Sequence, residues 1–145
     1  MDQCEALMKL IMEAVRNGTD AKTASEEKPE SGAITVGVSN RHVHLSDGDL
    51  EKLFGAGYEL TKLKDLSQPG QFLSEERVTL VTPKGRIENV AVLGPERPYV
   101  QVELSATDAR TLGVKAPLKM SGDLNGAGDV YIIGPEGVYD AKGSA

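Results

Sequence analysis

Short apolar runs separated by turn-forming residues fill residues 33–145, and this pattern restricts the fold more than any other feature. The chain holds 16 Gly and 7 Pro, which interrupt it before a run reaches the length of a long helix. Most runs alternate apolar and polar residues, the period of a strand with one buried face. They lie at 34–38 continuing to 45, 58–63, 78–81, 87–93, 99–104, 130–133 and 138–139. We therefore predict a mainly β (α+β) fold, a small, partly closed β-barrel capped by short helices.

Two of those helices are predicted where a serine precedes apolar residues at helical spacing. Ser46 begins a helix that Gly55 ends, and Ser105 precedes a helix over 106–112 that Gly113 follows. Serine hydroxyls cap helix N-termini, and glycine favours the turn that ends a helix. Hydrophobic residues make up 39% of the chain and Trp is absent, so we expect an aliphatic core.

The N-terminal region is predicted to be organised differently, as an amphipathic helix over 1–18 joined by a polar linker over 19–32 to the domain at 33–145. The apolar stripe of the helix consists of Cys4, Leu7, Met8, Ile11, Met12 and Val15. A single stripe on a tether must dock on its own domain, on another copy or on a different protein. Docking on its own domain is the default, and the length of the linker favours an external groove.

Charge and cysteine content exclude several classes of protein. The formal net charge of −6 argues against nucleic-acid binding, which is driven by Lys and Arg. Cys4 is the only cysteine, so no intrachain disulfide and no Cys-rich zinc site are expected, and a reducing compartment is. The sequence shows neither an apolar run of about 20 residues for a membrane span nor a secretory signal. We expect a soluble, cytoplasmic protein that does not associate with a membrane.

The only two histidines of the chain, His42 and His44, are two residues apart. On a strand they share one face, as the ligands of a divalent metal do, most often zinc. The alternative is a solvated strand with two incidental histidines. A third ligand would be Glu103, which shares the polar face of its own strand with Gln101. From the pattern alone, Glu103 is also explained as a solvent-facing residue.

Arg41 and Arg97 are the candidates for binding an anion. Arg97 follows Glu96 and precedes a proline, so its backbone is restricted and its guanidinium can hold phosphate at low entropic cost. The alternative is a surface arginine paired with Glu96. Lys64 is a weaker candidate because most lysines are solvated. The glycine-rich loop at 121–122 could bring backbone amides close to a phosphate, with a simple turn as the alternative.

Six segments, taken in order, resemble a known family. They are 37–46 (GVSNRHVHLS), 68–71 (QPGQ), 93–95 (LGP), 101–105 (QVELS), 107–113 (TDARTLG) and 120–124 (MSGDL). Together they are similar to the PduL-type phosphotransacylases, the phosphate propanoyltransferase family. The resemblance covers 33–145 and is far more specific than two histidines alone.

The resemblance implies a phosphate acyltransferase, in which phosphate attacks the thioester of propanoyl-CoA or acetyl-CoA and acyl phosphate and free coenzyme A are formed reversibly. It also implies one zinc ion held by His42, His44 and Glu103, with Arg97 as the catalytic residue that holds phosphate. The residues implied to contact coenzyme A are Ser39, Asn40 and Lys64.

The resemblance also implies partners. Family members carry two similar β-barrel domains, and we expect the second, with its own metal site, to be absent from this chain. A complete active site would then need that second domain or another copy. Residues 1–18 are similar to peptides that carry such enzymes into bacterial microcompartments, which implies shell proteins as partners. The alternative functions are a noncatalytic metal- or CoA-binding β-domain and a shell-interaction module.

Overall fold

The computed structural model describes residues 5–9, 12, 32–37 and 39–145, and it divides the chain into two compact units, Met1–Gly37 and Val38–Ala145. In the first unit residues 5–9 are helical. Apart from these residues and Met12, the predicted N-terminal helix, Cys4 included, lies outside the described residues, as does almost all of the linker. Within the described ranges, no helix is both long enough and apolar enough to cross a membrane.

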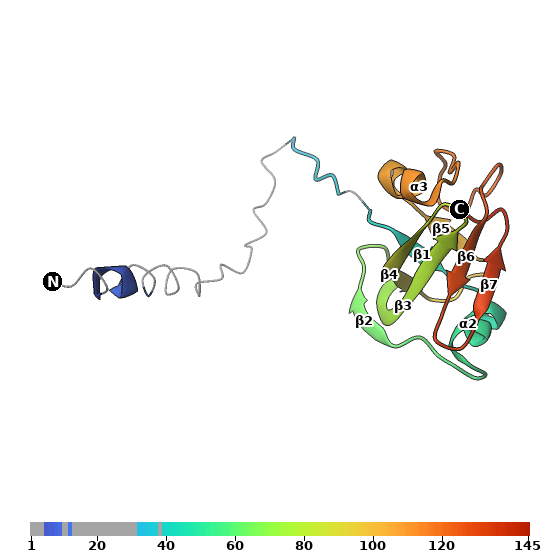
Figure 1. Ribbon diagram of the computed structural model, residues 1–145, viewed down its shortest axis with the longest axis horizontal. Coiled ribbons are helices and arrows are strands. Elements are labelled where there is room, and N and C mark those ends of the chain that lie inside the picture. The colour runs from blue at the N-terminus through green and yellow to red at the C-terminus, as the bar shows by residue number, and fades with distance from the viewer. Residues whose placement is uncertain (1–4, 10–11, 13–31, 38) are drawn as a thin grey trace. The chain divides into compact units, whose positions relative to one another are not determined.

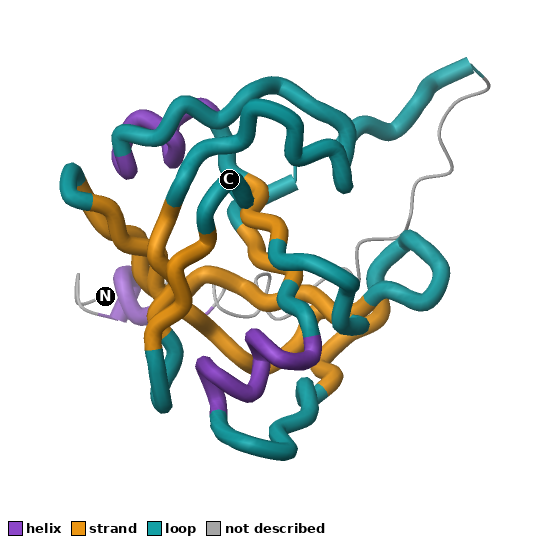
Figure 2. The backbone as a smooth tube through the Cα atoms, turned by 90° about the vertical axis from the view of Figure 1, so that its right-hand side faces the viewer, coloured by secondary structure: helices purple, strands orange, loops and turns teal. Residues whose placement is uncertain are grey.

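The second unit is built on one curled sheet with two short helices (Figures 1 and 2). Its elements are β1 (His42–His44), α2 (Asp47–Phe54), β2 (Lys62–Asp65), β3 (Phe72–Thr82), β4 (Gly85–Gly94), β5 (Gln101–Glu103), α3 (Ala106–Leu112), β6 (Val130–Ile133) and β7 (Val138–Ala141). The strand order is β5-β1-β4-β3-β6-β7, with β2 added on β3. Only the β1–β4 pairing is parallel among the described strands. The predicted mainly β, α+β fold is confirmed as a curled half-barrel.

The two ends of the curled sheet are joined by backbone hydrogen bonds. The Val102 N–H in β5 donates to the Ser144 carbonyl, which lies just after β7, at 2.7 Å. The Gly128 N–H, shortly before β6, donates to the Ala145 carbonyl at 2.6 Å. The first of these bonds occupies a backbone group of the edge strand β5 that would otherwise be open to another strand. The last residues of the chain therefore close part of the gap in the half-barrel.

The core lies on one face of this sheet and is aliphatic, as predicted. Val43, Val92 and Leu80 are completely buried, and each such side chain contributes about 1.5–3 kcal/mol on burial. The other strands, both helices and the adjoining loops add residues to the same cluster, with Leu45, Leu50, Leu53, Val78, Ile87, Val90, Val100, Val102, Leu112, Val130, Ile132, Ala141 and Ala145. The opposite face of β1 and β5 is thus left for polar side chains.

Both predicted helix caps are confirmed. The Ser46 hydroxyl accepts the Asp49 N–H at 3.3 Å, and the Ser105 hydroxyl accepts the Asp108 N–H at 3.1 Å. Gly113 ends α3 in the left-handed conformation, with φ of 64°, which glycine adopts without a steric penalty. Each cap contributes about 1 kcal/mol to the stability of its helix.

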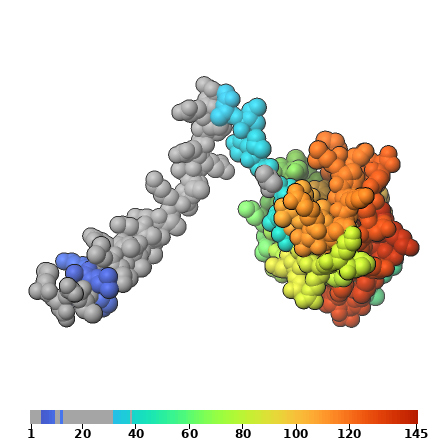
Figure 3. All heavy atoms as spheres, turned by 45° about the horizontal axis from the view of Figure 1, so that its top comes forward, coloured from blue at the N-terminus to red at the C-terminus, as the bar shows by residue number. Residues whose placement is uncertain are grey.

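The helices lie at opposite ends of the curled sheet, and each ends against a hairpin turn (Figure 1). In the β3–β4 turn, a Cβ atom on Gly85 would overlap the Thr111 carbonyl of α3. In the β6–β7 turn, Gly134 lies equally close to the Leu53 carbonyl of α2, which also accepts the Glu136 N–H at 2.9 Å. In Figure 3 the orange segment that contains α3 lies next to the yellow-green part of the chain that contains the β3–β4 turn.

One strand prediction is wrong. Residues 32–37 and 39–40 form no strand, and β1 begins only at His42. Ile34 and Val36 are 88% and 83% exposed. The alternation at 34–38 therefore does not lead to burial, because no neighbouring strand pairs with this segment in the described residues. The strand predicted at 58–63 is found later, as the exposed strand β2.

Candidate metal and anion site

Two short strands from distant parts of the sequence create the site, because β1 and β5 pair side by side and antiparallel. The paired residues are His42 with Glu103, Val43 with Val102, and His44 with Gln101. Side chains alternate between the faces of a strand, so both valines enter the core. The four polar side chains share the opposite face. This register brings together the three residues that were predicted to bind a metal.

The three side chains lie close enough to hold one ion. His42 Nε2 is 3.2 Å from Glu103 Oε2, and His44 Nε2 is 3.8 Å from Glu103 Oε1. One potential ligand atom from each residue lies within 4.8 Å of the other two. The two imidazole rings meet edge to face, with centroids 5.0 Å apart. Both histidines are buried and the Glu103 side chain is 31% exposed, so the cluster opens to solvent on the carboxylate side.

The hydrogen bonds of the histidines favour a cation between them and Glu103. His42 Nδ1 is 2.8 Å from the Asn40 carbonyl, which can only accept, so Nδ1 carries the proton. In neutral His42 the Nε2 lone pair then faces a carboxylate oxygen, and two acceptors repel unless a proton or a cation lies between them. The Asn40 carbonyl on Nδ1 of His42, the ring nitrogen away from Glu103, is the usual way to orient a metal-binding histidine. In His44, by contrast, Nδ1 is buried and has no hydrogen-bond partner among the described residues.

Electrostatics keep the carboxylate ionised. Hydrogen bonds from His42 and His44 hold the pKa of Glu103 far below its usual range. Burial lowers the pKa of His42, but its hydrogen bonds to Glu103 and to the Asn40 carbonyl outweigh burial and raise it. Burial lowers the pKa of His44, with a further contribution from the positive charge of Arg97. An anionic oxygen next to two imidazoles, one of them favoured in its neutral form, matches what a divalent cation requires.

Two histidines and one carboxylate form a ligand set found in zinc sites that keep one position open. Zinc bonds of about 2.0–2.1 Å place tetrahedral ligand atoms roughly 3.4 Å apart. The distance of 3.2 Å from Glu103 Oε2 to His42 Nε2 is close to this value, and one ligand atom from each of the three residues lies within 4.8 Å of the others. The donor set of this chain therefore fits zinc.

A cavity of about 520 Å³ opens next to the cluster. Six of the predicted site residues line it, namely Ser39, Asn40, His42, His44, Arg97 and Glu103. Arg41, the other anion candidate, lines it too, and its Nη2 forms an ion pair with Asp108 at 3.1 Å. Lys64 is not among the lining residues and is exposed on β2, so its contact with coenzyme A stays a prediction.

Arg97 is held at the edge of this cavity by hydrogen bonds. Its backbone N–H donates to the Leu45 carbonyl at 2.8 Å. Its Nη1 donates to Gln101 Oε1 at 3.2 Å and to the Ser121 hydroxyl at 3.4 Å. A guanidinium fixed in this way beside a cation site is suited to binding a phosphate group. The alternative of a pair with Glu96 is not seen among the ion pairs of the described residues.

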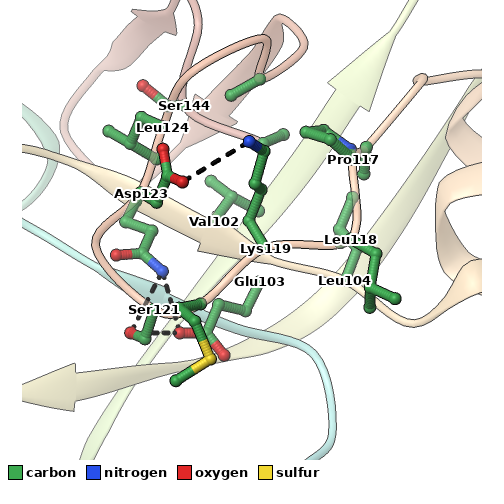
Figure 4. Close-up of a pocket in the computed structure, with 15 residues that line it drawn as sticks. Val102, Glu103, Leu104, Pro117, Leu118, Lys119, Ser121, Asp123, Leu124 and Ser144 are labelled. Carbon is green, nitrogen blue, oxygen red and sulfur yellow. Dashed lines mark hydrogen bonds and ion pairs between the residues drawn. The ribbon is translucent and has the colours of Figure 1, made fainter.

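Two residues of the site were not predicted as functional from the sequence. The sequence pattern predicts Gln101 on the polar face beside Glu103 but indicates no role for it. The pattern points to Ser121 only through the backbone of its loop, whereas the Ser121 hydroxyl donates to Glu103 Oε1 at 2.9 Å. Figure 4 shows Ser121 and Glu103 meeting below a smaller pocket that residues 116–124 form over β5. The strand alternation of Gln101 with Glu103 was the available signal.

Comparisons with known proteins agree on one family. The family model described as phosphate propanoyltransferase matches residues 35–144. A phosphate propanoyltransferase of Thermotoga maritima is 63% identical over 105 residues, which cover 72% of this chain and 50% of the relative. One from Priestia megaterium is 46% identical over 140 residues, covering 96% of this chain and 62% of the relative.

A third relative has the same relation to the chain. The phosphate propanoyltransferase of Clostridioides difficile is 63% identical over 99 residues, 68% of this chain and 47% of that protein. The chain thus spans about half the length of the curated relatives it matches. The matched family region, 35–144, contains all four residues of the proposed metal and phosphate site. The chain therefore belongs to the phosphate propanoyltransferase family.

Proposed function

We propose that this chain contributes to phosphate acyl transfer, in which a short acyl-CoA and phosphate are interconverted with acyl phosphate and coenzyme A. Propanoyl-CoA is the proposed acyl donor, with acetyl-CoA as a second one. One observation carries the proposal: His42, His44, Glu103 and Arg97 converge on one cavity inside the region that matches the family model. The names of the relatives supply the reaction.

The metal ligands in this proposal are His42, His44 and Glu103. A bound zinc ion would act as a Lewis acid that polarises the thioester carbonyl or stabilises the departing thiolate. The protein contributes by presenting two buried imidazoles and an ionised carboxylate in a register that the β1–β5 pairing fixes. Because the ligands lie on paired strands rather than on loops, little reorganisation is needed when the ion binds.

Arg97 is proposed to bind and orient phosphate. A phosphate oxygen forms a bond to the acyl carbon, the carbon–sulfur bond breaks, and the electron pair of that bond leaves with the coenzyme A sulfur. Phosphate and the developing oxyanion are both negative, so a fixed guanidinium beside them lowers the energy of the transition state. The hydrogen bonds from Arg97 to Leu45 and Gln101 hold it at the cavity edge.

Coenzyme A is proposed to enter along the cavity wall that Ser39 and Asn40 form. Lys64 is proposed as a third contact, although it lies on exposed β2 and outside the cavity lining. A lysine at the protein surface suits the phosphate groups of a long nucleotide thiol better than the reacting thioester. Replacing Lys64 is therefore expected to weaken CoA binding more than it changes the chemical step.

The length difference from the relatives leads to a further part of the proposal. About half of the Thermotoga maritima and Clostridioides difficile relatives has no counterpart in this chain. We propose that a second domain, or another copy of the chain, supplies the remaining groups of the active site. The chain alone is then expected to bind metal and ligands but to turn over slowly or not at all.

We propose that the N-terminal region targets the protein to a bacterial microcompartment. Residues 1–18 carry an amphipathic sequence pattern and 19–32 a polar one, which together suit a tethered helix that a shell protein binds in a groove. Fusing residues 1–18 to a fluorescent protein tests this, since the fusion should co-localise with co-expressed shells. Diffuse fluorescence of an intact fusion would contradict the proposal.

The test of the proposed activity is phosphate-dependent release of coenzyme A from propanoyl-CoA. It is run with the full chain alone and with the part of the Thermotoga maritima relative that this chain does not match. We expect turnover in the mixture, and we expect it to be lost with His42→Ala or with a strong chelator. R86Q is the matched control, because Arg86 is exposed and pairs with Glu88, away from the cavity.

The same assay separates the alternatives. A noncatalytic metal- or CoA-binding domain would bind zinc or coenzyme A without turnover in the mixture. A shell-interaction module would bind no stoichiometric metal. The family match and the clustering of Arg97 with the metal ligands favour the acyltransferase over both.

A further inference from the structure

Gln101 is a buried polar residue at the centre of the site, with only 5% of its surface exposed. A buried carboxamide without partners would destabilise the fold. Here both ends of the amide are used. Its Oε1 accepts the Gly122 N–H at 3.0 Å and Arg97 Nη1 at 3.2 Å. Its Nε2 donates to Glu103 Oε1 at 2.9 Å and to the Ser121 hydroxyl at 3.3 Å.

The neighbours of Gln101 fix which way the amide faces. The Gly122 N–H and the Arg97 guanidinium can only donate, and the ionised Glu103 can only accept. Turning the amide over would place its NH₂ against two donors and its oxygen against a carboxylate. One orientation therefore satisfies all partners. The carboxamide bridges a positive and a negative side chain that do not themselves bond to each other in the described residues.

The bridge determines which oxygen of Glu103 remains for a cation. Glu103 Oε1 already accepts two hydrogen bonds, from Gln101 and from the Ser121 hydroxyl. Glu103 Oε2 lies 3.2 Å from His42 Nε2 and receives no other hydrogen bond in the described part of the chain. The carboxylate is therefore set to offer one oxygen, on the side of the histidines.

The same bridge restrains Arg97 and the loop above it. Arg97 uses Nη1 for Gln101 and Ser121, which leaves Nη2 and Nε for an anion. The loop carrying Ser121 and Gly122 is drawn onto β5 by the bonds to Gln101 and Glu103 (Figure 4). An ion pair between Lys119 and Asp123, at 3.5 Å, closes the loop on itself.

We propose that Gln101 is a positioning residue that links the metal carboxylate of Glu103 to the phosphate-binding Arg97 through one carboxamide. The inference rests on the metal and phosphate sites of the proposed function and assigns to Gln101 the task of holding them in a fixed relation. Outer hydrogen bonds of this kind usually tune metal affinity. Removing the amide should therefore weaken two binding events at once, one on each side of it.

The primary test is Gln101→Met, which keeps the length of the side chain and removes both hydrogen-bonding ends. We expect zinc affinity of the full chain to fall about 10- to 100-fold, measured by competition with a chromophoric chelator. We expect binding of inorganic phosphate to the zinc-loaded chain, followed by NMR chemical shifts, to weaken as well. Ser74 provides the matched control, because it is fully buried and its hydroxyl donates to the Val92 carbonyl. S74A should leave both affinities within about twofold, since its hydrogen bond is outside the site.

A double-mutant cycle separates positioning from a merely structural role. If Gln101 acts on phosphate through Arg97, Q101M should weaken phosphate binding in the wild-type background and cause no further loss once Arg97→Met is present. Equal losses in both backgrounds would overturn the inference. S121A is the fallback if Q101M does not fold, because Ser121 is exposed. It removes one of the two bonds to Glu103 Oε1 and should lower zinc affinity by a smaller factor.

The outcomes also separate this inference from the proposed function. Zinc and phosphate binding by the wild-type chain tests the proposed function. A wild-type chain that binds both, together with a folded Q101M that binds both equally well, overturns the role of Gln101 alone. A wild-type chain that binds neither overturns both.

Discussion

The two strand-to-helix junctions of the molecule share a design and differ in chemistry. The first arm, residues 42–55, begins HVHLS, and the second arm, residues 101–113, begins QVELS. In each, a valine enters the core, and a leucine and a capping serine lead into a helix that a glycine ends. Within these opening five residues only the polar positions of the strand differ, two imidazoles against an amide and a carboxylate. A common frame can thus carry different groups, because alternate strand positions are independent of the core.

The arms also differ in depth. β1 lies between β4 and β5, whereas β5 is at the edge of the sheet. Leu45 of the first arm is fully buried and Leu104, its counterpart in the second, is only partly buried. The histidines are covered, while Glu103 is partly open to solvent. The inner arm supplies the fixed floor of the site, and the edge arm supplies its accessible side.

The largest expected effect is on the affinity of the site for zinc. If both arms hold one ion, H44A in the first arm and E103A in the second should each lower zinc affinity by more than the roughly 10- to 100-fold seen when an outer partner is removed. Chelator competition measures this. A normal affinity in E103A, with a loss only in H44A, would show that the second arm does not take part.

The next largest effect compares how much one leucine of each arm contributes to the free energy of unfolding. Leu45→Ala removes a fully buried side chain and should lower the free energy of unfolding by about 2–5 kcal/mol. Leu104→Ala should cost roughly half as much, since Leu104 is only partly buried. Urea unfolding followed by circular dichroism measures both. Equal losses would contradict the difference in depth between the arms.

A carboxylate outside both arms provides a comparison for Glu103. Glu76 is buried and accepts hydrogen bonds from the Tyr58 hydroxyl and the Thr61 N–H, both at 2.9 Å. Burial raises the pKa of Glu76, but these bonds outweigh it and hold the pKa below the usual value. Glu76 therefore stabilises the fold above the unfolded pKa of about 4.3, and this contribution is lost as pH falls through the lower folded value.

Glu76→Gln should accordingly lower the free energy of unfolding by about 2 kcal/mol at pH 7. Its difference from wild type should shrink as pH falls from the unfolded pKa of about 4.3 through the lower folded pKa, where the carboxylate becomes protonated. Thermal unfolding across pH 3–8 measures this, and zinc affinity should stay unchanged. A stability difference that is constant with pH would mean that the charge of Glu76 is not the stabilising feature.

The smallest expected effect tests the similarity of the arms. Ser46→Ala and Ser105→Ala each remove a helix cap and should lower the free energy of unfolding by about 1 kcal/mol. Chemical unfolding compares the two variants, with Ser→Thr at each position as the conservative control. A loss confined to one variant would show that only one of the serines acts as a cap.

The sequence predicted well those features that depend on local pattern. Both capped helices, the hairpin around 83–85 and the shared face of His42 and His44 follow from spacing and turn chemistry, and all are found. The strand at 34–38 failed because alternation says nothing about whether a neighbouring strand exists to pair with it.

Long-range features of the site were harder to predict. That Glu103 meets the histidines depends on the register of β1 against β5. The residue pattern indicated Glu103 as a third ligand but explained it equally as a solvent-facing residue, and the resemblance to a family decided between the two. The bonds of Gln101 and Ser121 depend on how the loop at 116–124 folds over β5. The local sequence does not predict that contact.

The central claim is that β1 and β5 together form one zinc site, and anomalous X-ray scattering tests it most directly. Crystals of the full chain grown with zinc would be measured on both sides of the zinc absorption edge. We predict one anomalous peak about 2 Å from His42 Nε2, His44 Nε2 and a Glu103 oxygen. A folded chain whose only zinc peaks lie elsewhere, or one without a zinc peak, would contradict the claim.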